Sequence, residues 1–175
     1  MKTCAFTGHR PNSFPWKYDE TARDCVLLKK VLAGQIDALV GEGVTEWLSG
    51  MALGTDLWGA EIVLSLKKKN PALRLHCILP CEGQEVKWPK AEQERYRSIL
   101  RQADEVVYVS RAYHSDCMLE RNRYMVDRAS ILLAVYNGTR RSGTGMTVNY
   151  ADAKHRMITI INPITREVSV LNGKL

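Results

Sequence analysis

A glycine-rich segment at residues 137–151, NGTRRSGTGMTVNYA, contains the residue types that bind phosphate groups. It follows an apolar run and opens a helical pattern, and the start of a helix offers free backbone N–H groups to an anion. Its glycines can adopt backbone angles closed to other residues, and they let a ligand approach the main chain. Arg140 and Arg141 stand beside them, and guanidinium groups suit phosphate geometry. We therefore predict a phosphate site, with a threonine-capped surface loop as the alternative, at Ser142, Gly143, Thr144, Gly145 and Thr147.

A second glycine-rich segment, SGMALGTDLWGAE at residues 49–61, has an acid, Asp56, in the first turn of an expected helix. A carboxylate there would cap the helix and repel a phosphate placed on the helix end. Acids in dinucleotide-binding folds instead accept hydrogen bonds from ribose hydroxyls. We expect Asp56 to bind a sugar unless it only caps the helix, with Ser49 as a donor and with Gly50 and Gly54 leaving room for the ligand.

Neither segment has one of the two most familiar nucleotide-binding motifs. The dinucleotide pattern G-x-G-x-x-G and the P-loop pattern G-x-x-x-x-G-K-[ST] are both missing from the sequence. We therefore do not expect a standard NAD dehydrogenase or a P-loop ATPase.

The segment TGHRP at residues 7–11 follows the first apolar run. Gly8 ends the run, and Arg10 is a natural clamp for a phosphate or carboxylate. His9 is a candidate ligand residue or an ordinary loop residue, and the sequence supports both interpretations equally.

A polar residue interrupts the apolar stripe of the helical segment 115–129, SDCMLERNRYMVDRA. Asn122 falls on the stripe of Met118 and Met125, and Arg121 flanks it. A buried asparagine without hydrogen-bond partners costs about 1–3 kcal/mol. We therefore expect Asn122 either to tie down a neighbouring loop or to reach the binding loops, with Arg121 beside it.

Apolar runs of strand length alternate with helical patterns about six times. Short apolar strands between amphipathic helices are typical of a parallel sheet covered on both faces. We predict one Rossmann-like, doubly wound α/β domain over residues 1–175, with REVSVLNGKL as an antiparallel edge strand. Ligands bind such sheets outside the carboxyl ends of the strands, where these candidate residues lie. The predicted strands are 3–8, 46–50, 73–80, 105–110, 130–138 and 157–163, and the helices are 18–43, 56–69, 91–103, 115–129 and 146–155.

The composition is that of a soluble globular domain, with 45% hydrophobic and 25% charged residues. No apolar run approaches the roughly 20 residues that span a bilayer. The N-terminal residues MKTCAFTGHR do not form a signal peptide, so we expect a cytoplasmic protein. The formal charge of +6 favours anionic partners such as nucleotides or nucleic acid.

The five cysteines show no paired spacing and are expected to be reduced structural thiols. The run HCILPC brings His76, Cys77 and Cys81 together, but strand alternation would point His76 and Cys77 to opposite faces. We expect no metal site, and magnesium only as a companion of a phosphate ligand.

Taken in order, five segments resemble the SLOG superfamily, named for the DNA-processing protein Smf/DprA and the plant enzyme Lonely guy. They are most similar to its YspA/YpsA-like branch of bacterial and phage proteins. The resemblance implies a Rossmann-like sheet that binds a nucleotide or a nucleotide derivative. The segments are TGHRP, SGMALGTDLWGAE, LPCEGQEVKW, ERNRYMVDRAS and SGTGMTVNYA.

The resemblance leaves catalysis open. Lonely-guy phosphoribohydrolases carry P-G-G-x-G-T-x-x-E, whereas this chain has SGTGMTVNYA, with Asn149 or Tyr150 near the place of the acid. Glycosidic cleavage needs a carboxylate, and the candidates are Asp56 and Glu61. These two facing one ligand would require a distorted first helical turn.

The leading expectation is therefore a domain that binds a phosphorylated nucleotide-like ligand without an assigned reaction. The alternatives are an N-glycosidase acting on a nucleoside monophosphate-like ribotide and a single-stranded DNA binder, the latter by analogy with DprA. A homo-oligomer is a further expectation, because relatives often assemble.

Overall fold

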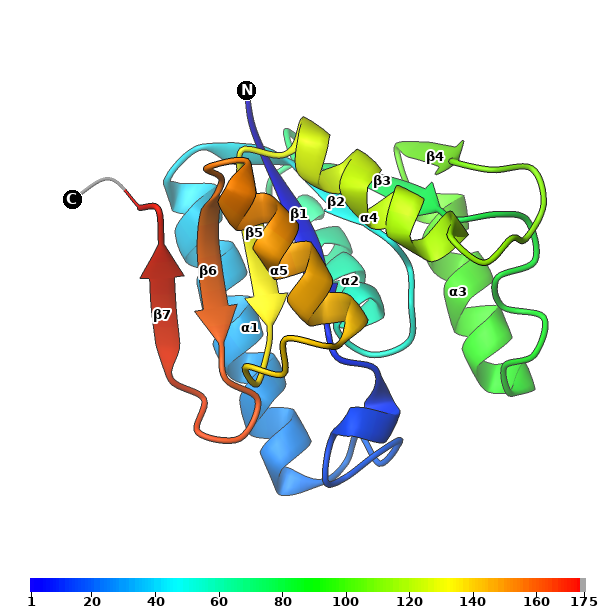
Figure 1. Cartoon of the computed structure of the whole chain (residues 1–175), viewed down its shortest axis with the longest axis horizontal. Coiled ribbons are helices and arrows are strands. Elements are labelled where there is room, and N and C mark those ends of the chain that lie inside the picture. Colours follow the sequence, from blue (N-terminus) through cyan, green and yellow to red (C-terminus); the bar gives the residue numbers. More distant parts are fainter. Residues whose placement is uncertain (174–175) are drawn as a thin grey trace.

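Strands and helices alternate along residues 1–173, which are the residues that the computed structural model describes (Figure 1). The alternation ends at the C-terminal side, where the last two strands follow each other without a helix between them. The strands are β1 (Lys2–Gly8), β2 (Val44–Ser49), β3 (Arg74–Leu79), β4 (Glu105–Tyr108), β5 (Ile131–Val135), β6 (Met157–Ile161) and β7 (Val168–Leu171). The helices are the 3₁₀ turn η1 (Pro11–Ser13), α1 (Arg23–Gly41), α2 (Thr55–Lys67), α3 (Lys90–Gln102), α4 (Cys117–Arg128) and α5 (Gly143–Ala153).

The seven strands form one sheet in the order β4-β3-β2-β1-β5-β6-β7. All neighbours are parallel except β7, which pairs antiparallel with β6 through Ile158↔Leu171 and Ile161↔Val168. The predicted doubly wound sheet with an antiparallel C-terminal edge is therefore confirmed. The chain moves outward from β1 to β4 and then crosses to β5 on the other side of β1. The topological switch point, where such folds bind ligands, lies between β1 and β5.

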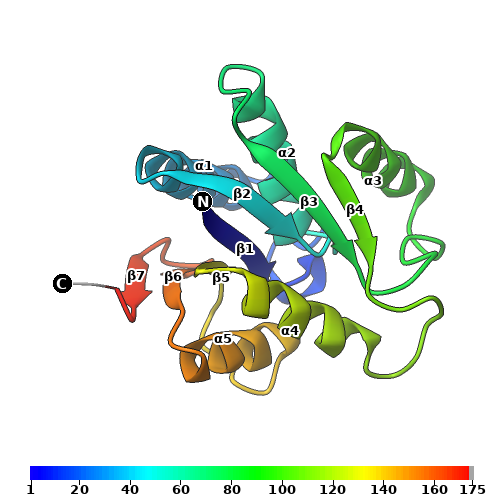
Figure 2. The ribbon, with the colours of Figure 1, turned by 90° about the horizontal axis from the view of Figure 1, so that it is seen from above.

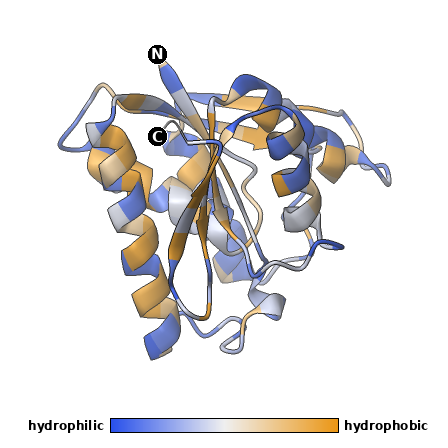
Figure 3. Ribbon diagram, turned by 60° about the vertical axis from the view of Figure 1, so that its left-hand side comes forward, coloured by the Kyte–Doolittle hydropathy of each residue, from blue (hydrophilic) through white to orange (hydrophobic). Residues whose placement is uncertain are grey.

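Helices cover both faces of the sheet (Figure 2), with α1, α2 and α3 on one face and α4 and α5 on the other. Alternation along β1 sends Phe6 into the core under α1 and α2, and Ala5 into the core under α4 and α5. Figure 3 shows the strands mainly in the hydrophobic colour, whereas the helices carry both colours. The central strands β1 and β5 are buried on both faces and therefore consist of apolar runs without polar alternation, whereas the edge strands β4 and β7 are mainly exposed.

Two helices, α1 and α5, begin three or more residues from the start that the periodicity predicts. Helix α1 begins at Arg23 and not near residue 18, because η1 and a turn occupy the preceding residues. Asp19 fixes that turn by accepting hydrogen bonds from the backbone N and Oγ1 of Thr21, at 3.0 and 2.5 Å. Helix α5 begins at Gly143, earlier than residue 146, because Ser142 caps it.

The sequence HCILPC folds as the alternation predicts. Cys77 lies in the core, while the His76 ring faces the opposite side and contacts Glu46 at 2.5 Å and Glu105 at 2.9 Å. All five cysteines are buried and free. Within residues 1–173, no cluster of three potential metal ligands occurs, and no helix is long and apolar enough to cross a membrane.

Replacement of Phe6 by alanine should lower the free energy of unfolding by about 3–5 kcal/mol. Phe6 is fully buried in the central strand and stacks on Trp47 with ring centroids 5.4 Å apart. Urea denaturation followed by circular dichroism measures the change. Val170→Ala on exposed β7 is the control and should stay within about 0.5 kcal/mol of the wild type. Equal losses in the two variants would contradict the central place of Phe6.

Candidate functional site

A cleft of about 400 Å³ lies at the carboxyl ends of β1 and β5, at the topological switch point. Three loops and helix α4 form its walls. Nine of the predicted site residues line it: Gly8, His9, Arg10, Asp56, Arg121, Asn122, Ser142, Gly143 and Thr144. The other lining residues, which sequence reasoning missed, are Thr7, Asn12, Ser13, Ala52 and Met118. The predicted residues outside the lining are Ser49, Gly50, Gly54, Gly145 and Thr147.

Arg121 is the dominant charge of the cleft, and only 3% of it is exposed. Its Nε donates to Asn122 Oδ1 at 2.7 Å, its Nη1 donates to the carbonyl of Gly50, and its Nη2 approaches Met118 Sδ at 3.9 Å. No carboxylate of the described residues lies within ion-pair distance. Burial lowers the pKa of the guanidinium, and the charge of Asp56 acts in the opposite direction. A buried cation without a directly paired carboxylate is costly, and a ligand anion would lower that cost.

Asn122 ties the two helices of this face together. Its Nδ2 donates to Thr147 Oγ1 at 2.9 Å, and that hydroxyl donates to the carbonyl of Gly143 at 2.9 Å. The expected order of burial in α4 is reversed, because Arg121 is buried and Asn122 is only half-buried. Asn122 thus both fixes the neighbouring helix and lines the cleft, so the two expectations for it do not exclude each other.

The loop after β2 holds Asp56 in a fixed position. Asp56 is 6% exposed, and its Oδ2 accepts a hydrogen bond from the backbone N of Ala52 at 3.3 Å. The helix begins after Gly54 without a side-chain cap, and the hydrogen bond that Asp56 accepts comes from the preceding loop and not from the helix. Burial raises the pKa of the Asp56 carboxyl, with the positive charge of Arg121 opposing the shift. Asp56 is the sole carboxyl among the lining residues.

Ser49 has a structural position that excludes direct contact with a ligand. It is fully buried, its Oγ donates to the Asp56 carbonyl at 2.9 Å, and it accepts from the backbone N of Met51 at 3.2 Å. Met51 is also fully buried and has a φ of 59°, in the left-handed region that non-glycine residues seldom adopt. Such backbone strain accumulates at functional sites, where the surrounding structure maintains it.

The glycines make room for protein atoms more than for a ligand, which corrects the expectation from sequence. A Cβ at Gly50 would overlap the guanidinium of Arg121, and a Cβ at Gly8 would overlap Thr55. A Cβ at Gly145 would lie 2.5 Å from the Thr139 carbonyl oxygen. Of the four predicted binding glycines outside the first strand, Gly54 alone has a positive φ, at 91°. The open space beside Gly143 is the exception.

The start of α5 has the features of an anion site. Ser142 Oγ accepts from the backbone N of Gly145 at 3.0 Å and donates to the Thr139 carbonyl at 2.7 Å. Among the described residues, the backbone N–H groups of Gly143 and Thr144 have no acceptor. The first turn contains no acid, so the positive end of the helix dipole is not offset. Arg140 and Arg141 are exposed and lie outside the cleft lining.

His9 joins the loops that follow β1 and β5. Its Nε2 lies 2.8 Å from Asn137 Oδ1 and 3.2 Å from Asn137 N, and these contacts require opposite roles of the ring nitrogen. Asn137 Oδ1 also accepts from Thr139 N at 3.0 Å, which identifies it as the oxygen. We therefore assign the proton to Nε2, which donates to Asn137. Burial lowers the pKa of His9, and the hydrogen bond to Asn137 opposes that shift.

Arg10 is exposed at the mouth of the cleft. Its hydrogen-bonding contact is weak, a 3.9 Å approach of Nη2 to Met118 Sδ. The guanidinium is therefore available to a bound anion.

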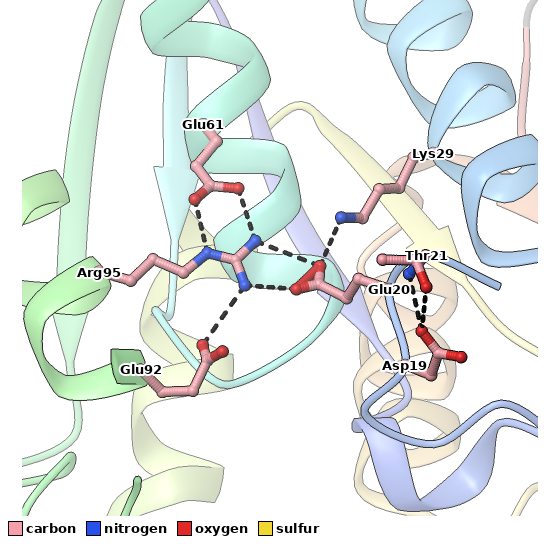
Figure 4. Close-up of polar contacts among 7 residues, drawn as sticks. All are labelled: Asp19, Glu20, Thr21, Lys29, Glu61, Glu92 and Arg95. Carbon is pink, nitrogen blue, oxygen red and sulfur yellow. Dashed lines mark hydrogen bonds and ion pairs between the residues drawn. The ribbon is translucent and has the colours of Figure 1, made fainter. Parts of the chain in front are cut away.

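Glu61 does not line the cleft, which corrects its candidacy as a catalytic carboxylate there. Its two oxygens accept hydrogen bonds from Arg95 at 2.6 and 2.7 Å (Figure 4). Helix α2 is regular over this stretch, so Glu61 points away from the side that carries Asp56. Of the two candidate carboxylates for glycosidic cleavage, Asp56 alone lies in the described cleft.

Gly50→Ala should lower the free energy of unfolding by about 1–3 kcal/mol, because the added methyl displaces the buried Arg121 side chain. Gly34→Ala in α1 is the matched control, since a methyl group there would meet no atom within 4 Å and alanine favours a helix. Urea denaturation compares the two variants. A Gly50→Ala protein as stable as Gly34→Ala would contradict the close packing of Arg121 on Gly50.

His9 should make the protein less stable at mildly acidic pH. Its pKa is lowered in the folded state, so the unfolded chain binds more protons, and stability is lost as the pH falls through the unfolded value of about 6.5. Urea denaturation at pH 7.5 and 5.5 should show a smaller loss for His9→Gln than for the wild type. An equal loss would contradict a buried neutral His9.

A model of the YspA SLOG family matches residues 4–165. A UPF0398 protein of Bacillus pumilus is 35% identical over 169 residues, which cover 91% of this chain and 89% of the relative. A UPF0398 protein of Bacillus licheniformis is 36% identical over 142 residues, covering 78% and 75%.

Two solved structures of DNA processing protein A (DprA) share the fold. The Streptococcus pneumoniae protein has a TM-score of 0.61 and 18% identity, and the match covers 92% of this chain and 50% of that one. The Helicobacter pylori protein has a TM-score of 0.61 and 16% identity, with 92% and 65% covered. This chain therefore spans half to two thirds of those proteins, and the likeness at such identities concerns the fold alone. By the extent of the family match and the identity to its relatives, the chain belongs to the YspA SLOG family.

Proposed function

We propose that the cleft binds a nucleotide or a nucleotide-derived phosphorylated ligand. The observation that carries this proposal is the guanidinium of Arg121, which is buried in the cleft wall without a carboxylate partner among the described residues. A ligand anion would supply the missing counter-charge. The volume of about 400 Å³ lies within the range of small-molecule sites.

The polar groups favour one orientation of the ligand. The free N–H groups of Gly143 and Thr144 and the exposed Arg10 suit the phosphate. Asp56, on another wall of the cleft, suits the sugar, because a carboxyl oxygen accepts hydrogen bonds from ribose hydroxyls. This division assigns phosphate to the start of α5 and the sugar to the loop after β2.

The test is native mass spectrometry of gently purified protein, followed by a thermal-shift panel of nucleotides, ribotides, NAD and ADP-ribose, with and without magnesium. Arg10→Ala should weaken the binding of a phosphorylated ligand by about 10- to 100-fold, because a charge-assisted hydrogen bond is lost. Arg101→Ala is the matched control, because Arg101 is exposed on α3, where it pairs with Glu94, and its replacement removes the same charge. Equal effects would indicate nonspecific electrostatic attraction, and no bound mass or shift in the panel would overturn the proposal.

Gly143→Asp tests the phosphate end separately. A Cβ at Gly143 would meet no atom within 4 Å, so the fold should tolerate the change, while the new acid repels an anion at the helix start. Gly143→Ala controls for the loss of the glycine. We expect Gly143→Asp to abolish the thermal shift and Gly143→Ala to retain at least part of it. Equal shifts in the two variants would place the phosphate elsewhere.

Single-stranded DNA is a second candidate ligand. The Helicobacter pylori DprA structure is described with a single-stranded DNA binding mode, and this chain shares the fold and has a formal charge of +6. Binding through phosphates should weaken linearly with the logarithm of the salt concentration. Fluorescence anisotropy of a labelled oligonucleotide measures this binding. An affinity that barely changes with salt would count against DNA in this cleft, and so would binding that a mononucleotide does not compete away.

Hydrolysis of a ribotide is favoured by one observation only, the buried Asp56 carboxyl in the cleft. If the cleft cleaves an N-glycosidic bond, free base should accumulate with a nucleoside monophosphate, and Asp56→Asn should stop its release. Chromatography of the reaction mixture measures the base. Release that persists in Asp56→Asn would exclude this residue as the catalytic carboxyl.

A further inference from the structure

A second arginine, Arg95, is the centre of an ion cluster outside the cleft (Figure 4). Arg95 lies on α3 and donates two hydrogen bonds to Glu61 of α2, at 2.6 and 2.7 Å. Its Nη1 donates to Glu20 at 2.6 Å and to Glu92 at 3.3 Å, and Lys29 of α1 also contacts Glu20. One guanidinium therefore joins two helices to the segment that precedes α1.

That segment, residues 9–22, supplies part of the cleft. His9, Arg10, Asn12 and Ser13 all line it. His9 N donates to the Val135 carbonyl at 3.2 Å, and the Ala22 carbonyl accepts from Val26 N of α1 at 3.0 Å. The other backbone hydrogen bonds of the segment stay within it. Its position therefore depends on side-chain contacts with the rest of the protein.

Two contacts attach the segment to α2. Buried Phe14 stacks on Trp58 of α2 with centroids 5.6 Å apart, and Glu20 meets Glu61 of α2 through Arg95. The first contact is apolar and insensitive to salt, whereas the second is ionic. Burial alone would lower the pKa of Arg95, but hydrogen bonds and charge from Glu61 and Glu20 outweigh burial and raise it. The guanidinium therefore stays charged and the cluster stays joined at ordinary pH.

We propose that Arg95 is a positioning residue for the cleft. Its ion pairs with Glu20 and Glu61 hold residues 9–22, which we call the strap, against α2. When these ion pairs break, the stacking of Phe14 on Trp58 keeps the strap attached to α2, while its other residues become more mobile. The effect on the ligand rests on the proposed function, because it passes through Arg10. The strap itself is a property of the ligand-free protein.

Hydrogen exchange of the ligand-free protein tests the strap. Arg95→Met keeps the aliphatic stem and removes the charge, and it should speed amide exchange in residues 10–22 by about fivefold, the loss expected for a partly exposed ion cluster. Arg101→Met is the control, since Arg101 is on the same helix and pairs with exposed Glu94. Glu20→Gln should have the same effect, because it removes the charge with which Arg95 pairs in the strap. Unchanged exchange in Arg95→Met and Glu20→Gln would overturn the inference.

The conservative variant Arg95→Lys separates charge from packing. It should restore part of the exchange protection, because a lysine still pairs with Glu20, whereas a purely packing role would make the lysine and methionine variants alike. The second readout is the affinity for inorganic phosphate and for AMP, which should fall about fivefold in Arg95→Met. Faster exchange with unchanged affinity would overturn the positioning role. If the wild type binds neither probe, the proposed function fails, and exchange alone still decides whether the strap exists.

Discussion

The buried guanidinium of Arg121 is the constraint on which the arrangement of the cleft depends. A charge in that position must be solvated by protein dipoles, and the chain provides the Gly50 carbonyl, the Asn122 side chain and the Met118 sulfur. Gly50 has to be glycine because the guanidinium occupies the space of a side chain there. Met51 then adopts a left-handed conformation, and Ser49 anchors the turn to the first residues of α2. The position of Asp56 therefore follows from the same packing that accommodates Arg121.

The doubly wound topology determines why two helix starts meet at this point and why they differ. Because β1 lies between β2 and β5, the loops after β2 and β5 open on either side of the residues that follow β1. Both helices direct their positive dipole ends toward the cleft, but α2 carries Asp56 in its first turn, whereas α5 carries no acid. The electrostatic difference between the two helix starts is thus due to one side chain, Asp56. It makes the cleft asymmetric, with one wall that suits an anion and another that suits hydrogen-bond donors.

Much of this organisation can be predicted from the sequence, because apolar periodicity determines the layers and strand ends determine where ligands bind. The five apolar positions of α1 and the antiparallel edge strand follow from pattern alone. The pattern does not show what lies against each glycine. Gly50 packs against Arg121, which is far away in the sequence, and Gly145 packs against the carbonyl of Thr139, which lies in an irregular loop. Helical spacing does predict that Glu61 and Asp56 lie on different sides of α2, but only the folded chain shows that Arg95 lies opposite Glu61. Arg121 is a predicted ligand residue beside Asn122, but its burial depends on the close approach of α4 to the loop after β2, which the pattern does not show.

Arg95 and Arg121 are the same side chain in opposite electrostatic settings, and the contrast shows which of them has a structural role. Arg95 is partly exposed and meets three glutamates, so its charge is satisfied within the protein and its contribution is to hold segments together. Arg121 is more deeply buried and forms no ion pair among the described residues, although the charge of Asp56 acts on it without direct contact. If stability alone decided, we would expect a glutamate to pair with buried Arg121. Pairing that charge would stabilise the protein more than a third glutamate beside partly exposed Arg95. Stability does not explain a buried arginine without a directly paired carboxylate, and this is the reason for the proposal that the cleft recognises an anion.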